Sequence, residues 1–320
     1  MRTLTPLKQF IIVAAILVLA YFGVMPVLMR KIKQDNGQQQ AKLQETREVN
    51  KNSLHPDVNI ISSAPQGQVV LPHKDCIKMP GSVRQDLYIC VHPVKNDIWI
   101  SGALKSGKLW EDSLIQEMMV ALKADQRLQL IDIGCNIGLY SLWAAALDRH
   151  VLSVEMMMTN VQLLQMSLEL SNLTSMVTIV NNAIYKDHRE LGVKLISDNI
   201  GGNSLDVPNT PDVIDDKAAK LTVKTICMND LVPLVRNTRV YLKMDIENSE
   251  HFALQCADEF FKEVDVKIVQ MEWHQRVPEN RQVILSFMAS RGYNMSRSAN
   301  SNMYVDMNSI PGDVFFLKVS

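Results

Sequence analysis

The stretch that decides the predicted fold is Leu130-Ile131-Asp132-Ile133-Gly134-Cys135-Asn136-Ile137-Gly138. An apolar run that carries one carboxylate leads into two glycines four residues apart, with an asparagine between them. Seventeen residues after Gly138, Glu155 closes a second short apolar run. The order strand, glycine turn, helix, strand, acid is the first half of a nucleotide-binding α/β unit. Glycines let a backbone approach a ligand closely, and an acid at the tip of the second strand can accept hydrogen bonds from both ribose hydroxyls.

The spacing of this loop separates it from two common phosphate-binding motifs. Its form, Asp-x-Gly-x-Asn-x-Gly, has neither the Gly-x-Gly-x-x-Gly spacing of dinucleotide enzymes nor the Gly-Lys-Ser/Thr of a phosphate loop. It is similar to the S-adenosylmethionine loop of Rossmann-like methyltransferases, whose ligand has no phosphate. An ordinary strand-to-helix turn followed by an exposed strand end is the alternative. The acid at the expected distance, on a second strand, favours cofactor binding.

Length and composition indicate one sizeable globular domain with an appendage. The chain has 320 residues, of which 47% are hydrophobic and 21% charged, as in ordinary globular proteins. Its formal net charge is −1. Nucleic-acid binding relies on many contacts from Lys and Arg to phosphates, so we expect no nucleic acid among the partners.

The appendage is N-terminal and is predicted to bind a membrane. Residues 10–29 carry no charge, and twenty residues in a helix match the hydrocarbon core of a bilayer. A cleaved signal peptide is the alternative, but its apolar core is usually shorter and ends at a small-residue cleavage site. Here Arg30, Lys31 and Lys33 follow the run, which favours an uncleaved signal anchor.

Three regions follow from this pattern. We expect an N-terminal tail and transmembrane anchor over 1–33, because the apolar run ends there. Residues 34–71 are mostly polar, with no sustained apolar period, and are predicted to form a stem. Residues 72–320 form the predicted catalytic domain.

Weaker sequence signals indicate on which side of the membrane the domain lies. The positive charges that flank the span are nearly balanced and slightly favour a cytosolic C-terminus, but long domains often translocate regardless of charge. Asn172-Leu173-Thr174 and Asn294-Met295-Ser296 are glycosylation sequons, and Cys76 and Cys90 are spaced for a disulfide. These features favour a type II protein of the Golgi or endoplasmic reticulum with a lumenal domain. The remaining cysteines are expected to be buried thiols: Cys135, Cys227 and Cys256.

Strands and helices are predicted to alternate through the domain. Apolar runs at 128–133, 151–155, 177–180, 240–244, 266–271 and 314–318 read as strands, with helical patterns between most of them. The fold class is therefore α/β, a Rossmann-like, doubly wound and mostly parallel seven-stranded sheet. Residues 87–91 and 97–101 are predicted to form an additional pair of strands.

Further along the chain, several motifs resemble the FkbM-type methyltransferase family. They occur in the family's order between about Trp110 and Glu272. Asn248 departs from the family's usual glycine, although asparagine tolerates left-handed backbone, and Met156 departs from the usual proline. The resemblance implies O-methyl transfer from S-adenosylmethionine, and anchored animal members are similar to secretory-pathway proteins. The motifs are residues 132–138, 153–155, 182–184, 201–204, 242–250 and 270–274.

Position along the strands assigns candidate cofactor contacts. Residues of the glycine loop would surround the amino-acid end of S-adenosylmethionine, the acid after the second strand its ribose, and the tip of the third strand its adenine. The acid that ends the fourth strand would lie near the reacting methyl group. These candidates are, in order, Asp132, Gly134, Asn136 and Gly138; Glu155; Asn182 and Ala183; and Asp245.

Methyl transfer to a hydroxyl needs positioning and gains from a general base. The candidates are Asp245, Glu272 and His274, which end or follow the fourth and fifth strands. Each has a structural alternative: Asp245 could cap a helix, and His274 could be an exposed or hydrogen-bonded histidine. Clustered carboxylates could also bind a divalent cation, but no compact ligand motif is present, so no metal is predicted.

The sequence is therefore compatible with two functions. The first is a membrane-anchored O-methyltransferase that acts on a hydroxyl, with a glycan as a candidate acceptor. The second is an inactive binding or scaffold protein on a methyltransferase fold, motivated by Asn248 and Met156. The intact loop, Glu155 and Asp245 favour the enzyme.

Overall fold

A computed structural model describes residues 54–61, 75–82, 84–207, 221–237, 239–273, 277–301, 303, 305 and 312–319. All of them belong to one compact unit, Glu48–Ser320. No helix within these ranges is long and apolar enough to cross a bilayer. The predicted membrane span at 10–29 and the candidate His274 lie outside the described residues.

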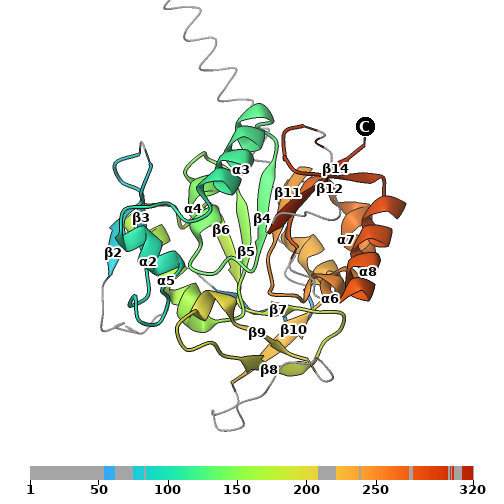
Figure 1. Ribbon diagram of the computed structural model, residues 1–320, viewed down its shortest axis with the longest axis horizontal. Helices are drawn as coiled ribbons and strands as arrows, with labels where there is room; N and C mark the ends of the chain where they lie inside the picture. The colour runs from blue at the N-terminus through green and yellow to red at the C-terminus, as the bar shows by residue number, and fades with distance from the viewer. Residues whose placement is uncertain are drawn as a thin grey trace, which may run out of the picture. The chain divides into compact units, whose positions relative to one another are not determined.

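The centre of the unit is a mostly parallel sheet, which confirms the predicted Rossmann-like α/β class (Figure 1). Five neighbouring strands, β6-β5-β4-β11-β12, pair in parallel. The sheet has eight strands among the described residues rather than seven, because β1 pairs antiparallel with β6 at one edge. In sheet order the strands are β1 (Ile60–Ile61), β6 (Val177–Val180), β5 (Val151–Val154), β4 (Gln129–Ile133), β11 (Arg239–Met244), β12 (Asp265–Glu272), β14 (Asp313–Lys318) and β13 (Tyr293–Ser296).

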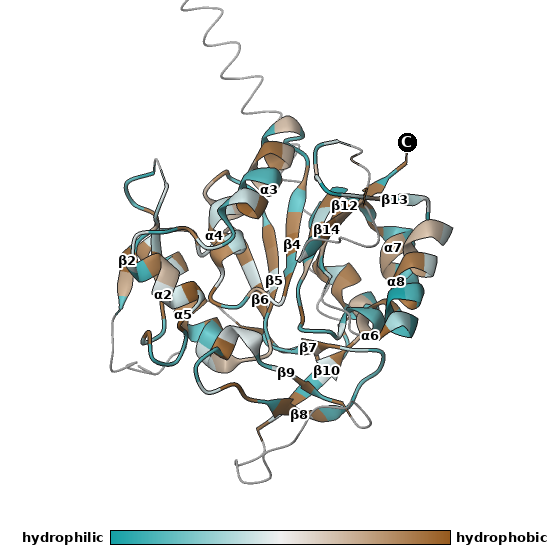
Figure 2. Ribbon diagram, viewed as in Figure 1, coloured by the Kyte–Doolittle hydropathy of each residue, from teal (hydrophilic) through white to brown (hydrophobic). Residues whose placement is uncertain are grey.

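Helices cover both faces of the sheet, so its central strands are buried on both sides. Leu130 of β4 belongs to the core that includes α3, α4 and α5, whereas Ile131 and Ile133 belong to the core that includes α6, α7 and α8. Strands buried on both faces are usually mostly hydrophobic, and Figure 2 shows this along β5, whereas β4 also carries the hydrophilic residues Gln129 and Asp132. The helices are α3 (Asp112–Ala124), α4 (Leu139–Ala145), α5 (Met158–Leu170), α6 (Glu250–Leu254), α7 (Asp258–Glu263) and α8 (Pro278–Ser290).

The prediction that 87–91 pairs with 97–101 is wrong. Strand β3 (Tyr88–Cys90) pairs instead with β2 (Cys76–Lys78), and 97–101 leads into the helix α2 (Ile100–Lys105). The carboxylate of Asp97 accepts the backbone N–H groups of Ile100 and Ser101, which stabilises the start of that helix.

Two disulfides join segments around the sheet. Cys76 and Cys90 face each other across β2 and β3 and are bonded, as predicted. Cys227 and Cys256 are also bonded, so the expectation of buried thiols is wrong for this pair. Their 29-residue separation carries no local pattern, and only the fold brings them together. Cys135 is a buried free thiol, as expected.

A second, four-stranded sheet, in the order β7-β10-β8-β9, lies below the central one in Figure 1. With the preceding 3-10 helix η2 (Ile200–Gly202), it presents residues to the carboxyl end of the central sheet. Its strands are β7 (Ala183–Ile184), β8 (Glu190–Lys194), β9 (Ser204–Asp206) and β10 (Thr222–Ile226).

Candidate functional site

A cavity of about 420 Å³ opens at the carboxyl ends of β4, β5, β11 and β12. This is the edge at which open α/β sheets bind ligands. Six of the predicted site residues line it together: Gly134, Asn136, Glu155, Asn182, Ala183 and Asp245, with Glu272 as a seventh. Asp132 and Gly138 are not among the lining residues.

The glycine loop owes its course to three positions with left-handed backbone, two of which are glycines. Gly134 has φ +76°, and a Cβ there would lie 1.8 Å from the carbonyl oxygen of Asp245. Gly138 has φ +86°, and a Cβ there would lie 2.3 Å from Leu164 Cδ1. Only glycine lets the loop pack this closely against β11 and α5. Asn136, at φ 51°, takes the same conformation, which asparagine tolerates.

Glu155 ties the loop to the second strand. Its Oε2 accepts a hydrogen bond from the backbone N–H of Asn136 at 2.9 Å. Its Oε1 accepts one from the backbone N–H of Met157 at 2.8 Å and one from the side-chain amide of Asn160 at 3.3 Å. Burial raises the pKa of the Glu155 carboxyl to about 7. A carboxylate offers about four acceptor positions, so this side chain retains capacity toward the cavity.

Asp132 lies beneath the loop rather than on its surface. The side chain is fully buried, and its Oδ2 accepts a hydrogen bond of 2.6 Å from Ser141 at the start of α4. Its Oδ1 has no hydrogen-bond partner among the described residues. Asp132 therefore supports the loop from below, in the electrostatic neighbourhood of Lys243.

One end of the cavity is rich in carboxylates. Lys243 is the only Lys, Arg or His among the described lining residues, and its Nζ lies 3.1 Å from Asp245 Oδ2. Burial disfavours the ammonium charge, but Asp245, Asp132 and Glu111 outweigh burial and raise the pKa of Lys243 above its ordinary value. The ammonium also lies 4.9 Å from the centre of the Tyr140 ring. The acids that line this end are Glu111, Asp245, Glu247, Glu272 and Asp313.

Three of the acidic-end residues were missed in the sequence: Glu111, Lys243 and Asp313. Glu111 precedes α3 with left-handed backbone and accepts hydrogen bonds from Trp110 Nε1 at 3.1 Å and Tyr140 Oη at 2.8 Å. Asp313 opens the antiparallel strand β14. Neither acid follows a parallel strand, so a search for acids at the ends of parallel strands could not find them. Lys243 lies two residues before Asp245 in the motif at 242–250 and is paired with Asp132 across β11 and β4, but the sequence motif alone assigned no role to its charge.

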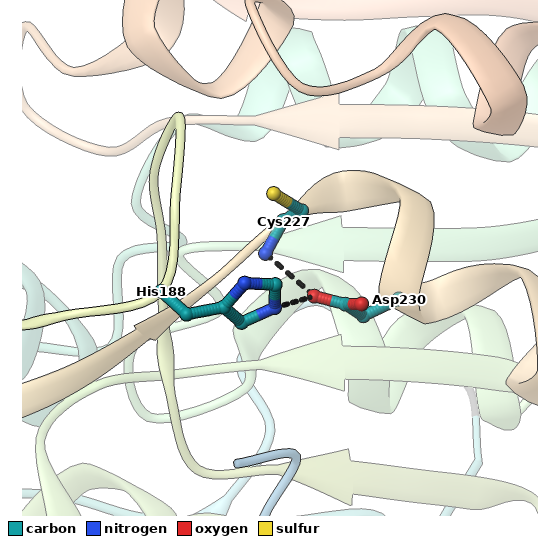
Figure 3. Close-up of side chains that lie close together, drawn as sticks. All are labelled: His188, Cys227 and Asp230. Atoms are coloured by element: carbon teal, nitrogen blue, oxygen red, sulfur yellow. Dashed lines mark hydrogen bonds and ion pairs between the residues drawn. The ribbon is translucent and has the colours of Figure 1, made fainter. Parts of the chain in front are cut away.

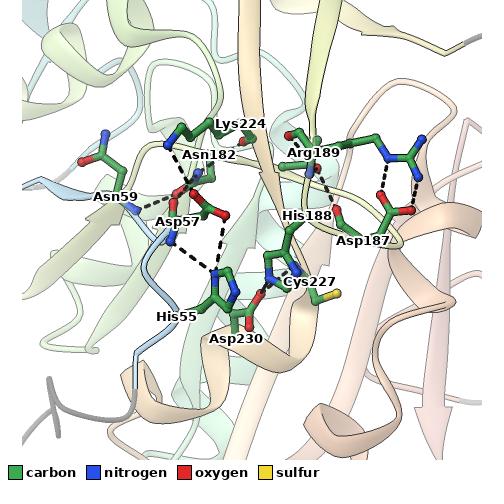
Figure 4. Close-up of polar contacts among 11 residues, drawn as sticks. His55, Asp57, Asn59, Asn182, Asp187, His188, Arg189, Lys224, Cys227 and Asp230 are labelled. Atoms are coloured by element: carbon green, nitrogen blue, oxygen red, sulfur yellow. Dashed lines mark hydrogen bonds and ion pairs between the residues drawn. The ribbon is translucent and has the colours of Figure 1, made fainter.

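Of the two predicted adenine contacts, Asn182 uses its side chain to hold the segment 54–61. Asn182 Oδ1 accepts Asn59 N–H at 2.8 Å, and its Nδ2 donates to the Asp57 and Lys224 carbonyls at 3.0 and 3.2 Å (Figure 4). Residues 54–61 fall in the region predicted to be a polar stem, yet Ile60 pairs with Val180 at the sheet edge. This segment therefore frames the cavity through Asn182.

A cluster of three residues beside the segment 54–61 has the spacing of a metal site but not a complete set of ligands. His188 Nε2 lies 2.7 Å from Asp230 Oδ2, and the Cys227 N–H donates to the same oxygen at 2.8 Å (Figure 3). Ligand atoms of the three residues lie within 4.8 Å of one another. The sulfur of Cys227 is bonded to Cys256, so it offers no thiolate.

Two tryptophans contribute to the wall of the cavity. Trp99 and Trp110 both line it, with ring centroids 6.1 Å apart. Trp99 is 52% exposed, which is unusual for so large an apolar ring. Together they offer an aromatic surface beside the carboxylates.

The comparison with known families decides the assignment. Residues 132–295, just over half of the chain, match the family described as "Methyltransferase FkbM domain". The chain belongs to the FkbM methyltransferase family. The matched range begins at the glycine loop and includes Glu155, Lys243, Asp245 and Glu272, so the cavity described above is largely the FkbM domain's own.

Solved methyltransferase structures are similar to this FkbM domain at low identity. A S-adenosylmethionine-dependent O-methyltransferase from Thermotoga maritima is 13% identical, with 73% of this chain and 74% of that chain covered and a TM-score of 0.34. Precorrin-6y C5,15-methyltransferase from Geobacter metallireducens is 12% identical, with 60% and 80% covered and a TM-score of 0.31. An rRNA methylase from Streptococcus thermophilus is 8% identical, with 60% and 87% covered and a TM-score of 0.33. No curated protein matches the chain.

Proposed function

We propose that the chain is an S-adenosylmethionine-dependent O-methyltransferase that methylates a hydroxyl group. One observation carries the proposal: the glycine loop with Glu155 and the carboxylate-rich end with Asp245 line the same cavity. The first arrangement suits a nucleoside, and the second suits a positive charge. S-adenosylmethionine carries both and, when bound, supplies an electrophilic methyl group on its sulfonium.

The residues present fit this cofactor. Gly134 has no Cβ to obstruct the loop, and Glu155 can accept hydrogen bonds from ribose hydroxyls. Met156, Ala183 and Ile184 provide apolar wall at the third strand, where adenine would lie. At the other end, carboxylates such as Asp245 favour a cation through charge alone.

The acceptor is proposed to be an uncharged polyhydroxy compound, with a glycan as the first candidate. Lys243 is already surrounded by Asp132, Asp245 and Glu111, so it leaves little positive potential for a phosphate or sulfate. Carboxylates can accept hydrogen bonds from hydroxyls, and the exposed ring of Trp99 can cover an apolar sugar face.

The cellular setting remains part of the proposal. An anchor at 10–29 with a lumenal domain is supported by the two disulfides, which persist in oxidising compartments. It is also supported by Asn172 and Asn294, the acceptor asparagines of the sequons, which are both exposed.

The alternative, an inactive scaffold, rests on Asn248 and Met156. Asn248 has φ 69°, a left-handed conformation that asparagine tolerates, so the substitution preserves the turn after β11. Met156 lines the cavity and can pack against a ligand. Neither residue removes a group that the proposed chemistry requires.

Calorimetric titration of the full-length chain in detergent with S-adenosylmethionine tests the proposal. We expect saturable binding that is weakened at least tenfold in Glu155→Ala, because ribose then loses its acceptor. Glu169→Ala, in which an exposed acid of α5 is removed, is the matched control and should bind normally. A folded wild-type chain that binds no S-adenosylmethionine would leave the scaffold alternative standing. Transfer of a labelled methyl group to p-nitrophenyl glycosides and to released N-glycans then tests the acceptor class.

A further inference from the structure

Asp313 stands directly opposite Glu272 across the antiparallel pair β12 and β14. Residues in direct register project from the same face of a sheet, and both of these line the cavity. Asp313 thus enters the cavity from a strand that the parallel part of the fold does not contain. Asp313 lines the same acidic end of the cavity as Asp245, which follows β11.

A chain of hydrogen bonds holds the Asp313 carboxylate in place. Its Oδ1 accepts the Gln270 Nε2 amide at 3.4 Å. That amide is itself oriented by two buried tyrosines, since Gln270 Oε1 accepts Tyr241 Oη at 2.8 Å and Gln270 Nε2 also donates to Tyr140 Oη at 3.2 Å. The other oxygen, Asp313 Oδ2, makes no hydrogen bond to any residue that the structure describes. One carboxylate oxygen is therefore positioned and the other is available.

The neighbouring carboxylates are less suited to accept a proton. Asp245 is paired with the Lys243 ammonium, and both oxygens of Glu111 already accept hydrogen bonds. Burial, followed by the charge of Asp245, raises the pKa of Glu272 to about 10, so Glu272 is protonated near neutral pH. Glu247 has left-handed backbone at φ 53° and makes no hydrogen bond to a described residue that would orient it.

We propose that Asp313 accepts the proton of the acceptor hydroxyl during methyl transfer, an inference that rests on the proposed function. The hydroxyl oxygen forms a bond to the methyl carbon, and the carbon–sulfur bond breaks with its electron pair remaining on sulfur. The hydroxyl proton passes to Asp313 Oδ2 and later leaves to solvent. Atoms and charge balance without a further reactant.

The electrostatics around Asp313 suit this role. Burial first, and then the negative charges of Glu111 and Asp245, raise the pKa of Asp313, whereas Lys243 and the Gln270 hydrogen bond lower it; together they bring this pKa to about 7. Glu272 faces it from β12, and Tyr140 and Tyr241 lie behind Gln270. A general base whose pKa lies near the working pH is deprotonated in a useful fraction of molecules and still has a strong driving force for accepting the proton.

The test compares Asp313→Asn with Glu247→Gln in the full-length chain, with labelled S-adenosylmethionine as donor and the p-nitrophenyl glycosides and released N-glycans as acceptors. We expect Asp313→Asn to lower kcat about 10²- to 10⁴-fold and to remove the rise in kcat near pH 7. Its affinity for S-adenosylmethionine should stay within about threefold of wild type. Asp313→Glu should recover part of kcat, since it restores a carboxylate.

Three results would overturn the inference. Asp313→Asn could retain the wild-type pH profile, or Glu247→Gln could lose it instead. A wild-type chain that binds S-adenosylmethionine yet methylates no probe would reject the proton-acceptor role together with the transferase activity. A folded chain that does not bind the cofactor at all is a different result, because calorimetry then rejects the proposed function itself.

Discussion

Gly134 packs directly against the carbonyl oxygen of Asp245, because a Cβ at Gly134 would lie only 1.8 Å from that oxygen. The contact joins the glycine loop to the strand that ends in the acidic part of the cavity. It explains why the first glycine of the motif is required by packing within the protein itself, independently of any ligand.

Gly134→Ala is expected to destabilise the chain by more than about 2 kcal/mol, because a left-handed backbone and a backbone clash add together. Urea unfolding measures the loss. Gly81→Ala is the matched control: Gly81 has φ +75°, but a Cβ there meets no atom within 4 Å. It should cost only the backbone strain, about 1 kcal/mol. Equal losses in the two variants would argue against the close packing of the loop.

Lys243→Met is expected to destabilise the fold by about 3–5 kcal/mol at pH 7.5, because it leaves the buried carboxylates around Asp132 and Asp245 without their cation. The loss should shrink at pH 5, because burial raises the pKa of Asp132 and its carboxyl can then take up a proton more readily. Chemical denaturation at the two pH values measures it. In the control Lys224→Met, an exposed pair with Asp57 is removed, and the change should stay below about 1 kcal/mol.

Glu155 should make stability depend on pH in the direction opposite to a salt-bridged acid. Its pKa is about 7 in the folded chain and 4.5 as the ordinary value, so the folded state binds the proton more tightly. Its contribution to stability is therefore present at low pH and is lost as pH rises from about 4.5 to 7. The difference corresponds to about 3 kcal/mol.

Glu155→Gln removes this titration, so its unfolding free energy should fall less than that of wild type between pH 5 and 7.5. Urea unfolding at several pH values gives the comparison. Other buried acids, such as Glu250, act in the same direction in both proteins and cancel in the difference. Parallel pH curves for the two proteins would show that Glu155 keeps an ordinary pKa.

Loss of the Cys227–Cys256 disulfide is expected to destabilise the chain by about 3–4 kcal/mol, from the closure of a 29-residue loop in the unfolded state. The double variant Cys227→Ser/Cys256→Ser, compared with wild type in thermal unfolding, measures the effect. Cys76→Ser/Cys90→Ser, with a separation of 14 residues, should lose slightly less. Mass spectrometry of the unreduced wild-type chain checks that both bonds are present.

Much of the parallel core could be read from local pattern. The apolar runs at 151–155 and 177–180 became β5 and β6 within one residue, because strands buried on both faces leave a continuous hydrophobic signal. The segment 97–101 was misassigned because its capping by Asp97 overrides an apolar run of strand-like composition. Strand β1 was missed because two apolar residues, Ile60 and Ile61, are too short a signal.

The glycine loop, Glu155 and Asp245 could be found from local pattern, because each belongs to a unit of consecutive elements whose spacing is set by strand and helix lengths. Folding was needed to bring Glu111, Lys243 and Asp313 together at one end of the cavity and to place Asn182 against the segment 54–61. These contacts join elements that are far apart along the chain, so no local pattern records them. An antiparallel strand such as β14 places its first residue, not its last, at the carboxyl edge of the parallel sheet.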